Sequence, residues 1–402
     1  MKHVSRILST YSADTFGVCS ALYELGGMIV IHDPSGCNST YTTHDEPRWF
    51  AEPSQIFVSA LTEQDAILGN DSRLIADITA AAKELQPRFI CLIPSQIAHM
   101  IATDCRAICR ILEKKTGIPA FTLPTNSMHY YERGIFFALQ KLAELACQAL
   151  PEAAAPRRLP EAKWLSEEEL HKLRQGKGRA LRVNLLGATP LDFSLNGSIL
   201  SLRRWLEARG CHVASCWAMG SALDAILASH EADLDLVLSY GGLGAARVLH
   251  ERAGIPYRIG IPFPHCASAR GDAACPPEGP AYIIGETVFA ESLSRALEAA
   301  IGLPFTAIVP METDDELLLP GTLRLTDEDE LSPVLREAAL IIADPLYQPI
   351  CPAGAAFLSL PHIAFSGRLY EKTIPNLIEE EAFTDFVQKV QKNLGKLPQN
   401  RV

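Results

Sequence analysis

The sequence predicts an α/β protein built from three Rossmann-like domains with parallel sheets, arranged in series. The first observation is a set of short, continuous apolar runs, such as RFICLIP at 88–94, which are typical of strands buried on both faces. The second is that amphipathic helical stretches, such as 72–85, separate these runs. The third is that loops containing glycine or proline follow many of the runs. This alternation of strand and helix implies parallel sheets covered by helices.

The first domain is predicted to span residues 1–150. A short helical run near Ala21 stops at Gly26-Gly27, a helix C-terminus signal, and Pro87 ends a later helix. The expected strands are 28–31, 56–61, 88–94 and 120–123, and the expected helices are 62–68, 72–85, 95–115 and 134–150.

Residues 151–180 change in character and are predicted to form a linker with one exposed helix. The stretch is charged, its start is rich in proline, and Ser166 and Glu169 form a capping box. Beyond the linker, the pattern predicts a second Rossmann-like domain at 181–280 and a third at 281–402, which ends in a C-terminal helix. The expected strands are 181–186, 211–216, 234–239, 257–261, 282–284, 306–309, 340–344 and 357–365, and the expected helices are 198–209, 222–229, 245–253, 288–301 and 379–393.

Composition excludes several classes of protein. The net charge of −11 argues against a general nucleic-acid binder, which needs a basic face. No apolar run reaches the length needed to span a membrane, and the N-terminal residues lack the apolar core of a signal peptide. We therefore expect a cytoplasmic protein that uses neither nucleic acid nor membrane as a partner.

Eleven scattered cysteines without any CxxC pair exclude a zinc ribbon, a ferredoxin-like site and a disulfide framework. Cys19 and Cys37 stand apart from the rest. Cys19 is expected beside a helix N-terminus, and Cys37 follows Gly36 in a tight loop after strand 28–31. Free backbone N–H groups at both places could lower the pKa of each thiol and donate hydrogen bonds to a metal-bound sulfur.

Other motifs leave a structural and a functional interpretation open. His32, Asp33, His44 and Asp45 lie near both cysteines in sequence, either as loop hydrogen-bonding groups or as part of a site. Gly241-Gly242-x-Gly244 opens a helix after a strand, which suits a phosphate cradle or close backbone packing.

Cys105 and Cys109 share a helix face, where core packing is favoured, and the acidic run 312–316 is expected to be a solvated face. The loop with Cys266 and Cys275, together with His265 and Arg270, follows a strand and is either a ligand site or a surface loop.

The chain resembles the component 1 superfamily of nitrogenase-like proteins, which includes nitrogenase molybdenum–iron subunits, cofactor scaffolds, dark-operative protochlorophyllide reductase subunits and the coenzyme F430 biosynthetic reductase. That superfamily has a cysteine at a helix start and a strand that ends in His-Gly-Pro-x-Gly-Cys. The counterparts here are Cys19 and the run 32–37, HDPSGC. The match covers most of the chain.

The resemblance implies a cluster with fewer ligands per chain than in a nitrogenase subunit. The third cluster cysteine of the superfamily is replaced here by Gln96. Two chains that each give Cys19 and Cys37 would supply the four thiolates of one [4Fe–4S] cluster. The resemblance therefore implies a cluster shared across a dimer interface, with a second copy or a paralogous component 1 subunit.

The ligands of the nitrogenase catalytic cofactor are not retained. Ser239 stands at the position of the cofactor cysteine, and Pro361, next to His362, stands at the position of the cofactor histidine. Reduction of dinitrogen is therefore not expected, unless His362 and a nearby thiol such as Cys266 or Cys351 take the place of these ligands.

The resemblance implies the catalytic component of a nitrogenase-like reductase. An iron-protein-like ATPase would use ATP and pass electrons through the shared cluster to a small organic substrate, tetrapyrrole-like or sulfur-containing. Ser239, His265 and His362 are the candidates for positioning that substrate or donating protons to it. The alternatives are a scaffold on which an iron–sulfur metallocofactor is assembled, and a small-molecule binding protein without iron.

Overall fold

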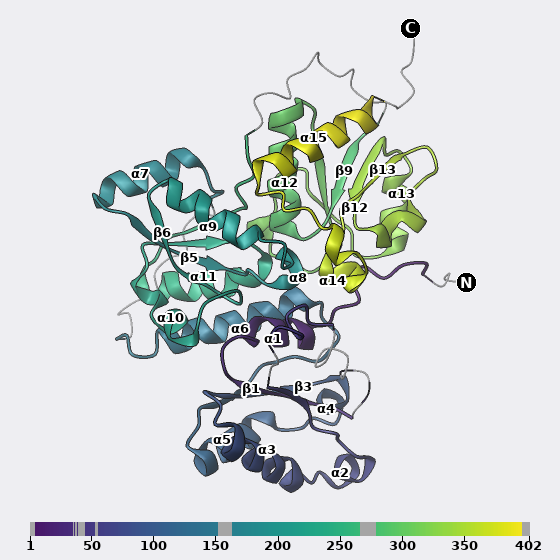
Figure 1. Cartoon of the computed structure of the whole chain (residues 1–402). Helices are drawn as coiled ribbons and strands as arrows, with labels where there is room; N and C mark the ends of the chain where they lie inside the picture. The colour runs from purple at the N-terminus through teal and green to yellow at the C-terminus, as the bar shows by residue number, and fades with distance from the viewer. Residues whose placement is uncertain are drawn as a thin grey trace.

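The computed structural model describes residues 5–34, 36, 38, 45–52, 55–151, 163–265 and 279–395. Within these residues the chain forms three sheets in which every strand pairing is parallel, with helices on their faces (Figure 1). The predicted fold class is confirmed. The limits of the three domains stay a prediction.

The first sheet has the strand order β2-β1-β3-β4. Alternate residues of a strand point to opposite faces, so Met28 and Val30 of β1 pack against α3 and α5, whereas Ile29 and Ile31 join the core shared with the rest of the molecule. Its elements are β1 (Met28–His32), β2 (Ile56–Val58), α2 (Glu63–Leu68), α3 (Ser72–Leu85), β3 (Ile90–Pro94), α4 (Gln96–Met100), α5 (Cys105–Thr116) and β4 (Ala120–Thr122).

The second sheet has the order β6-β5-β7-β8 and the third has the order β11-β10-β9-β12-β13. The elements of the second are α7 (Glu167–Lys177), β5 (Leu181–Leu186), α8 (Pro190–Phe193), α9 (Ser198–Ala208), β6 (Cys211–Cys216), α10 (Leu223–Leu227), β7 (Leu234–Val237), α11 (Tyr240–Ala253) and β8 (Tyr257–Ile259). Those of the third are β9 (Ala281–Ile284), α12 (Thr287–Ile301), β10 (Thr306–Val309), β11 (Leu323–Arg324), α13 (Glu328–Leu335), β12 (Leu340–Ala343), β13 (Ala356–Ser359), α14 (Ile363–Ser366) and α15 (Glu380–Leu394).

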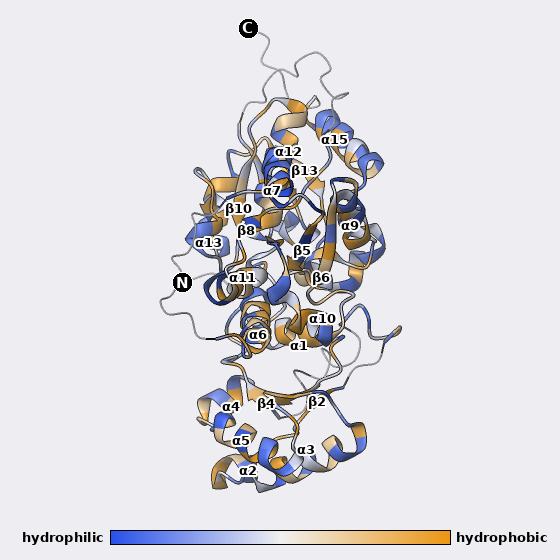
Figure 2. Cartoon of the chain, turned by 90° about the vertical axis from the view of Figure 1, so that its left-hand side faces the viewer, coloured by the Kyte–Doolittle hydropathy of each residue, from blue (hydrophilic) through white to orange (hydrophobic). Residues whose placement is uncertain are grey.

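Two helices, α1 (Asp14–Leu22) and α6 (Tyr131–Ala146), lie between the first sheet and α11 of the second (Figures 1 and 2). They cross with their backbones in direct contact. A Cβ atom added at Gly17 would lie 1.9 Å from the Tyr131 carbonyl oxygen, and one added at Gly134 would lie 1.8 Å from that of Asp14. Only glycine therefore fits at these two positions.

Several predicted elements differ from the structure in their limits. The helix expected over 95–115 is two helices, α4 and α5, because the chain turns at Ala102, which has a φ of 56°. The strand expected over 357–365 ends at Ser359. The linker helix is present as α7, and the predicted cap is confirmed, since the Ser166 hydroxyl accepts a hydrogen bond from the Glu169 backbone N–H at 3.2 Å.

The acidic run 312–316 is not the solvated face that the sequence suggests. Asp314 and Glu316 both pair with Arg247 of α11, with closest distances of 2.9 and 2.6 Å, and Glu312 pairs with His129 at 2.6 Å. The run therefore ties a loop of the third sheet to the other two parts of the molecule. None of the helices in the described residues is long and apolar enough to span a membrane.

Candidate functional site

Cys19 lies inside α1, not at its start. The helix begins at Asp14, and Cys19 follows it by more than one turn with only 1% of its surface exposed. The expectation of a helix N-terminus that lowers the pKa of this thiol is therefore wrong. Burial raises the pKa of Cys19, and the negative charge of Glu46 raises it further.

The loop after β1 approaches the same face of α1 that carries Cys19. The Asn38 side chain, one residue beyond Cys37, lies 3.4 Å from the hydroxyl of Thr15, and Thr15 and Cys19 are four residues apart on the helix. Asn38 also donates to the Asp33 carboxylate at 2.8 Å. Cys37 lies outside the described residues. Gly36 is described and has a φ of 137°, a conformation that favours glycine.

Gln96 opens α4 and is exposed to solvent. The preceding residue, Ser95, is buried and donates a hydrogen bond to Asp33, so the start of α4 and the loop after β1 are held together. Buried His32 contacts the Ser59 hydroxyl at 2.9 Å, and burial lowers the pKa of its imidazole. Cys19, the loop and Gln96 thus lie near the carboxyl ends of β1 and β3, where ligands bind in parallel sheets.

A buried ion-pair network lies beside Cys19. The Arg48 guanidinium bonds Glu46 at 2.7 Å and Glu24 at 2.8 Å, and it donates to the backbone carbonyls of Ser20 and Ala218, both at 2.8 Å. We refer to these contacts as the Arg48 network. It joins the segment 45–52 to α1 and to the loop after β6.

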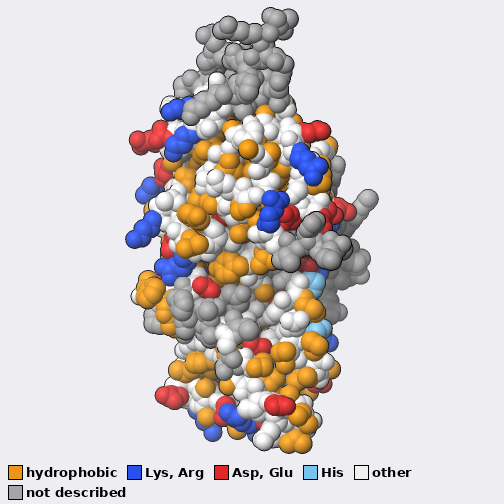
Figure 3. Space-filling view, turned by 90° about the vertical axis from the view of Figure 1, so that its right-hand side faces the viewer, with side chains coloured by type: hydrophobic (Ala, Val, Ile, Leu, Met, Phe, Trp, Pro, Cys, Tyr) orange, Lys and Arg blue, Asp and Glu red, His pale blue; other side chains and the backbone are white. Residues whose placement is uncertain are grey.

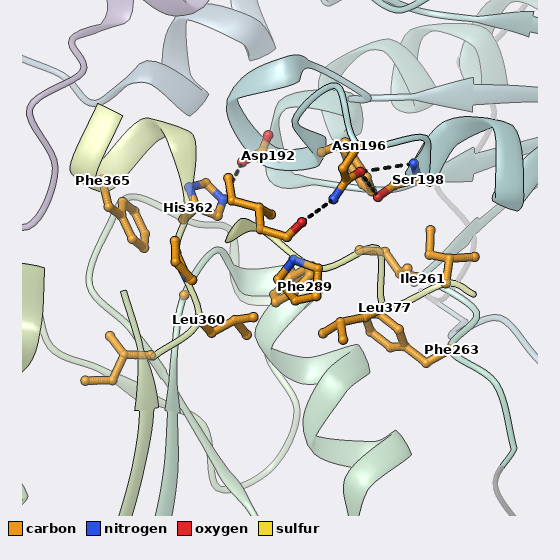
Figure 4. Close-up of a pocket in the computed structure, with 17 residues that line it drawn as sticks. Asp192, Asn196, Ser198, Ile261, Phe263, Phe289, Leu360, His362, Phe365 and Leu377 are labelled. Atoms are coloured by element: carbon orange, nitrogen blue, oxygen red, sulfur yellow. Dashed lines mark hydrogen bonds and ion pairs between the residues drawn. The ribbon is translucent and has the colours of Figure 1, made fainter. Parts of the chain in front are cut away.

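A cavity of 40 Å³ lies between the second and third sheets, and His362 is one of the residues that line it (Figure 4). This volume holds about three water molecules, since one water needs roughly 10–15 Å³. His362 precedes α14, its side chain is 9% exposed, and its ring stacks on Phe365 with centroids 4.5 Å apart. Its Nε2 lies 3.4 Å from Oδ1 of Asp192 without hydrogen-bond alignment.

Buried acidic residues surround the Asp192 side of this cavity. Tyr131 donates a hydrogen bond to Oδ1 of Asp192 at 2.5 Å. Glu286, before α12, accepts hydrogen bonds from the backbone N–H groups of Tyr240 and Phe289, both at 2.9 Å. Burial raises the pKa of Glu286 to about 8, and the charge of Asp192 adds to the increase. Burial likewise raises the pKa of Glu132 well above its usual range, with further increases from Asp192 and Glu286.

The three candidate catalytic residues lie in different places. Only His362 lines this cavity. Ser239 is fully buried and its hydroxyl donates to the Gly187 carbonyl at 2.8 Å, which holds the ends of β5 and β7 together. His265 is exposed and lines a different pocket, next to Trp164 and Arg295. His44, Cys266, Arg270 and Cys275 lie outside the described residues.

The glycines at 241, 242 and 244 serve close packing. They lie in the first turns of α11, which begins at Tyr240, before the predicted start. A Cβ atom at Gly242 would lie 2.4 Å from the Leu186 carbonyl oxygen, and one at Gly241 would lie 2.4 Å from Ile135 of α6. Cys105 and Cys109 are also core residues, packed with β1 and β3.

Sequence reasoning missed Glu132, Asp192 and Glu286. Asp192 and Glu286 each follow a buried strand by a few residues, and strand ends are where ligand sites occur in such sheets, so a signal was present. The sequence around Glu132 gives no sign of a site, because Glu132 lies in the first turn of a helix whose sequence has an ordinary amphipathic pattern.

The family model described as nitrogenase component 1 type oxidoreductase matches residues 15–270. The chain belongs to this family. The matched range contains Cys19, the loop after β1, Gln96 and the complete second sheet. The resemblance found in the sequence is confirmed.

Curated members of the family match part of the chain. The nitrogenase iron-molybdenum cofactor biosynthesis protein NifE of Clostridium pasteurianum is 26% identical over 233 residues, which are 57% of this chain and 44% of that protein. One of the subunits of light-independent protochlorophyllide reductase from Prosthecochloris aestuarii is 27% identical over 239 residues, 58% of this chain and 39% of that protein. The aligned region thus spans less than half the length of these two relatives.

The structural likeness extends over the whole chain. The solved structure of nitrogenase Cp1 at pH 6.5 superimposes with a TM-score of 0.66, covering 98% of this chain and 94% of that one. The sequence identity is 14%, so the likeness is one of fold.

Proposed function

We propose that this member of the nitrogenase component 1 family is the catalytic component of a reductase that acts on a small organic substrate and not on dinitrogen. Cys19 and Cys37 of two chains would hold a [4Fe–4S] cluster, and an ATP-using partner resembling the nitrogenase iron protein would be the electron donor. ATP is used by the partner and not by this chain.

The observation that carries the proposal is the contact between Thr15 and Asn38. It brings the residue after Cys37 against the face of α1 on which Cys19 lies, one turn away. Cys19 is a soft donor whose burial keeps it protonated until a metal ion binds and takes the proton's place. When bound, the cluster supplies one-electron transfer.

Surface composition supports a protein partner near Gln96. Figure 3 shows hydrophobic side chains on the lower part of one face, over α2 and α4. The large exposed apolar side chains of these two helices are Ile67, Leu68, Ile97 and Met100. Apolar side chains that gather on a surface are typical of interaction sites.

The cavity at His362 is the proposed substrate end of the protein. It lies at a junction of two sheets, beside the carboxyl ends of β9 and β13, where ligands bind in this class of fold. Its volume of 40 Å³ is much smaller than a tetrapyrrole. A tetrapyrrole would require the second and third sheets to move apart, whereas a small sulfur compound would need less rearrangement.

The proposal is tested by measuring iron and acid-labile sulfide on anaerobically purified protein, together with the EPR spectrum of the reduced sample. We expect about four iron atoms per two chains. Cys19→Ala and Cys37→Ala should each lose the cluster, whereas Cys147→Ala, which removes an equally buried thiol at the end of α6, should keep it. A full cluster in both of the first two variants would refute the assignment.

A second candidate function is a scaffold on which an iron–sulfur cofactor is assembled. The observation that favours it is the 26% identity with a cofactor biosynthesis protein. Catalytic turnover with ATP, the reductase partner and dithionite would support the reductase, and release of a bound iron–sulfur species to an acceptor protein would support the scaffold. A protein that is colourless after anaerobic purification would instead support a small-molecule binding protein without iron.

A further inference from the structure

Three buried carboxylates interact with one another through their charges, and each is carried by a different part of the fold. Glu132 lies in the first turn of α6, next to the first sheet. Asp192 lies on α8, after β5 of the second sheet, and Glu286 lies before α12, after β9 of the third. All three side chains are almost completely buried, with exposed fractions of 1 to 3%. We refer to these residues as the acid junction.

No lysine or arginine in the described residues forms an ion pair with the acid junction. The one basic partner in this part of the chain is His362, whose Nε2 lies 3.4 Å from Asp192. The other ionisable groups that interact with the junction are Tyr131, Tyr347 and Glu312, the last of which pairs with His129. Arg133 follows Glu132 in sequence, but its guanidinium bonds the Tyr240 hydroxyl. Three negative charges cannot be held together in a dry interior without compensation.

Three buried atoms at the junction have no hydrogen-bond partner among the residues that the structure describes. They are Oε2 of Glu132 and both ring nitrogens of His362, and the two side chains are more than nine-tenths buried. Buried polar atoms in native proteins are nearly always paired, so such atoms call for an explanation. A protonated carboxyl group on Glu132 would carry no charge, and an imidazole edge facing a small cavity is placed to exchange a proton with its contents.

We propose that the acid junction is a proton store, and that Asp192 and His362 pass its protons to whatever occupies the cavity. The contacts define the last step of the relay, from Asp192 to His362, and Glu132 and Glu286 interact with Asp192 through their charges. The Tyr131 hydroxyl bonds Oδ1 of Asp192 at 2.5 Å, and the same oxygen lies nearest to Nε2 of His362. Glu132 and Glu286 hold the protons behind Asp192. His362 is the group that meets the ligand, and Asp192 is a positioning residue that fixes which ring nitrogen carries the proton.

Only a proton moves along this relay. The imidazolium of His362 gives the proton on Nδ1 to the ligand: this N–H bond breaks as a bond to the ligand forms, and the ring is left neutral with its other proton on Nε2. The ring then turns so that the free Nδ1 meets Asp192, and a proton that passes through Asp192 restores the imidazolium. In its last step the inference rests on the proposed reductase function, in which each electron from the one-electron donor is matched by one such proton. The store itself does not depend on that function.

The store is tested by infrared spectroscopy at pH 7, following the carbonyl absorption of protonated carboxylic acids. We expect Glu132→Gln to lose the absorption of one carboxyl group per chain. Asp233→Asn should leave the absorption unchanged, because Asp233 is also a buried carboxylate, with 8% of its surface exposed, but is paired with Lys177 at 3.0 Å and Arg179 at 2.7 Å. If Glu132→Gln does not fold, Glu286→Gln and wild-type protein with ¹³C-labelled glutamate give the same information. If the carbonyl absorption of protonated carboxylic acids is changed neither by the glutamate substitutions nor by the ¹³C label, the proposed proton store is wrong.

The positioning role of Asp192 is tested by ¹⁵N NMR of the histidine rings. In the wild type we expect the proton of neutral His362 to lie on Nε2, facing Asp192, and Asp192→Asn should move it to Nδ1 in a substantial fraction of molecules. An identical ring pattern in both proteins would overturn the relay. Neither measurement needs the cluster. A protein without iron that passes both tests would refute the reductase and retain the store, whereas an iron-loaded protein that fails both would refute the store alone.

Discussion

Removal of the Arg48 side chain should destabilise the protein more than removal of any exposed arginine. The guanidinium is only 5% exposed, and Glu46, which accepts two of its N–H groups, is 1% exposed. Arg48→Ala would leave the Glu46 carboxylate buried without its partner and would leave the carbonyls of Ser20 and Ala218 without donors. Breaking one side of a buried ion pair costs about 3–5 kcal/mol. We therefore expect the free energy of unfolding to fall by about that amount.

The assay is urea unfolding followed by circular dichroism, with Arg73→Ala as the matched control. Arg73 is 55% exposed and lies 3.7 Å from each of two aspartates, an arrangement that contributes less than about 1 kcal/mol. The double variant Arg48→Met/Glu46→Gln removes the buried charges together and should recover much of the loss. If Arg48→Ala lowers the free energy of unfolding by no more than Arg73→Ala does, the network is not a buried one in which every polar group is paired, and the reasoning is refuted.

Two further predictions concern the helix crossing and the acid junction. Gly134→Ala should lower the free energy of unfolding by about 3 kcal/mol, because its Cβ atom would lie 1.8 Å from the Asp14 carbonyl oxygen. Gly176→Ala in α7 should raise the free energy of unfolding by up to about 1 kcal/mol, because the added Cβ atom would meet no neighbouring part of the protein within 4 Å. Thermal unfolding of both variants checks the two effects. Equal effects would contradict the close crossing. The pKa of Glu286 is raised from 4.5 to about 8, so between these pH values the folded state keeps a proton on Glu286 that the unfolded state has lost. The free energy of unfolding should therefore fall as the pH rises through this range, by up to about 1.4 kcal/mol per pH unit. Unfolding curves measured from pH 5 to 8 should show a weaker fall for Glu286→Gln than for the wild type, and an equal fall would contradict the assignment.

Strands and long helices could be predicted from the sequence because their signals are local. The run 88–94 contains β3 and the amphipathic stretch 72–85 is α3, since each pattern records which faces are buried. Limits that depend on distant contacts were missed. The start of α1 was placed too late, because its first residues are buried against α6 and the segment 126–129 and show no amphipathic pattern.

The candidate site divides in the same way. Cys19 and the loop after β1 were singled out by their local sequence setting and then by a family motif, and the placement of Cys19 within its helix was corrected by the structure. His362 was found beside the cofactor position of the family, and it does line a cavity. The acid junction could not be predicted, because its residues are about 60 and 94 positions apart along the chain and only the packing of three sheets brings them together.

The crossing of α1 and α6 has a mechanical consequence. Gly17 contacts the backbone of Tyr131, two residues before Cys19 on one helix and one residue before Glu132 on the other. Glycine has no side chain that could absorb a displacement by changing rotamer. A shift of α1 near Cys19 would therefore displace the start of α6, which carries Glu132 of the acid junction.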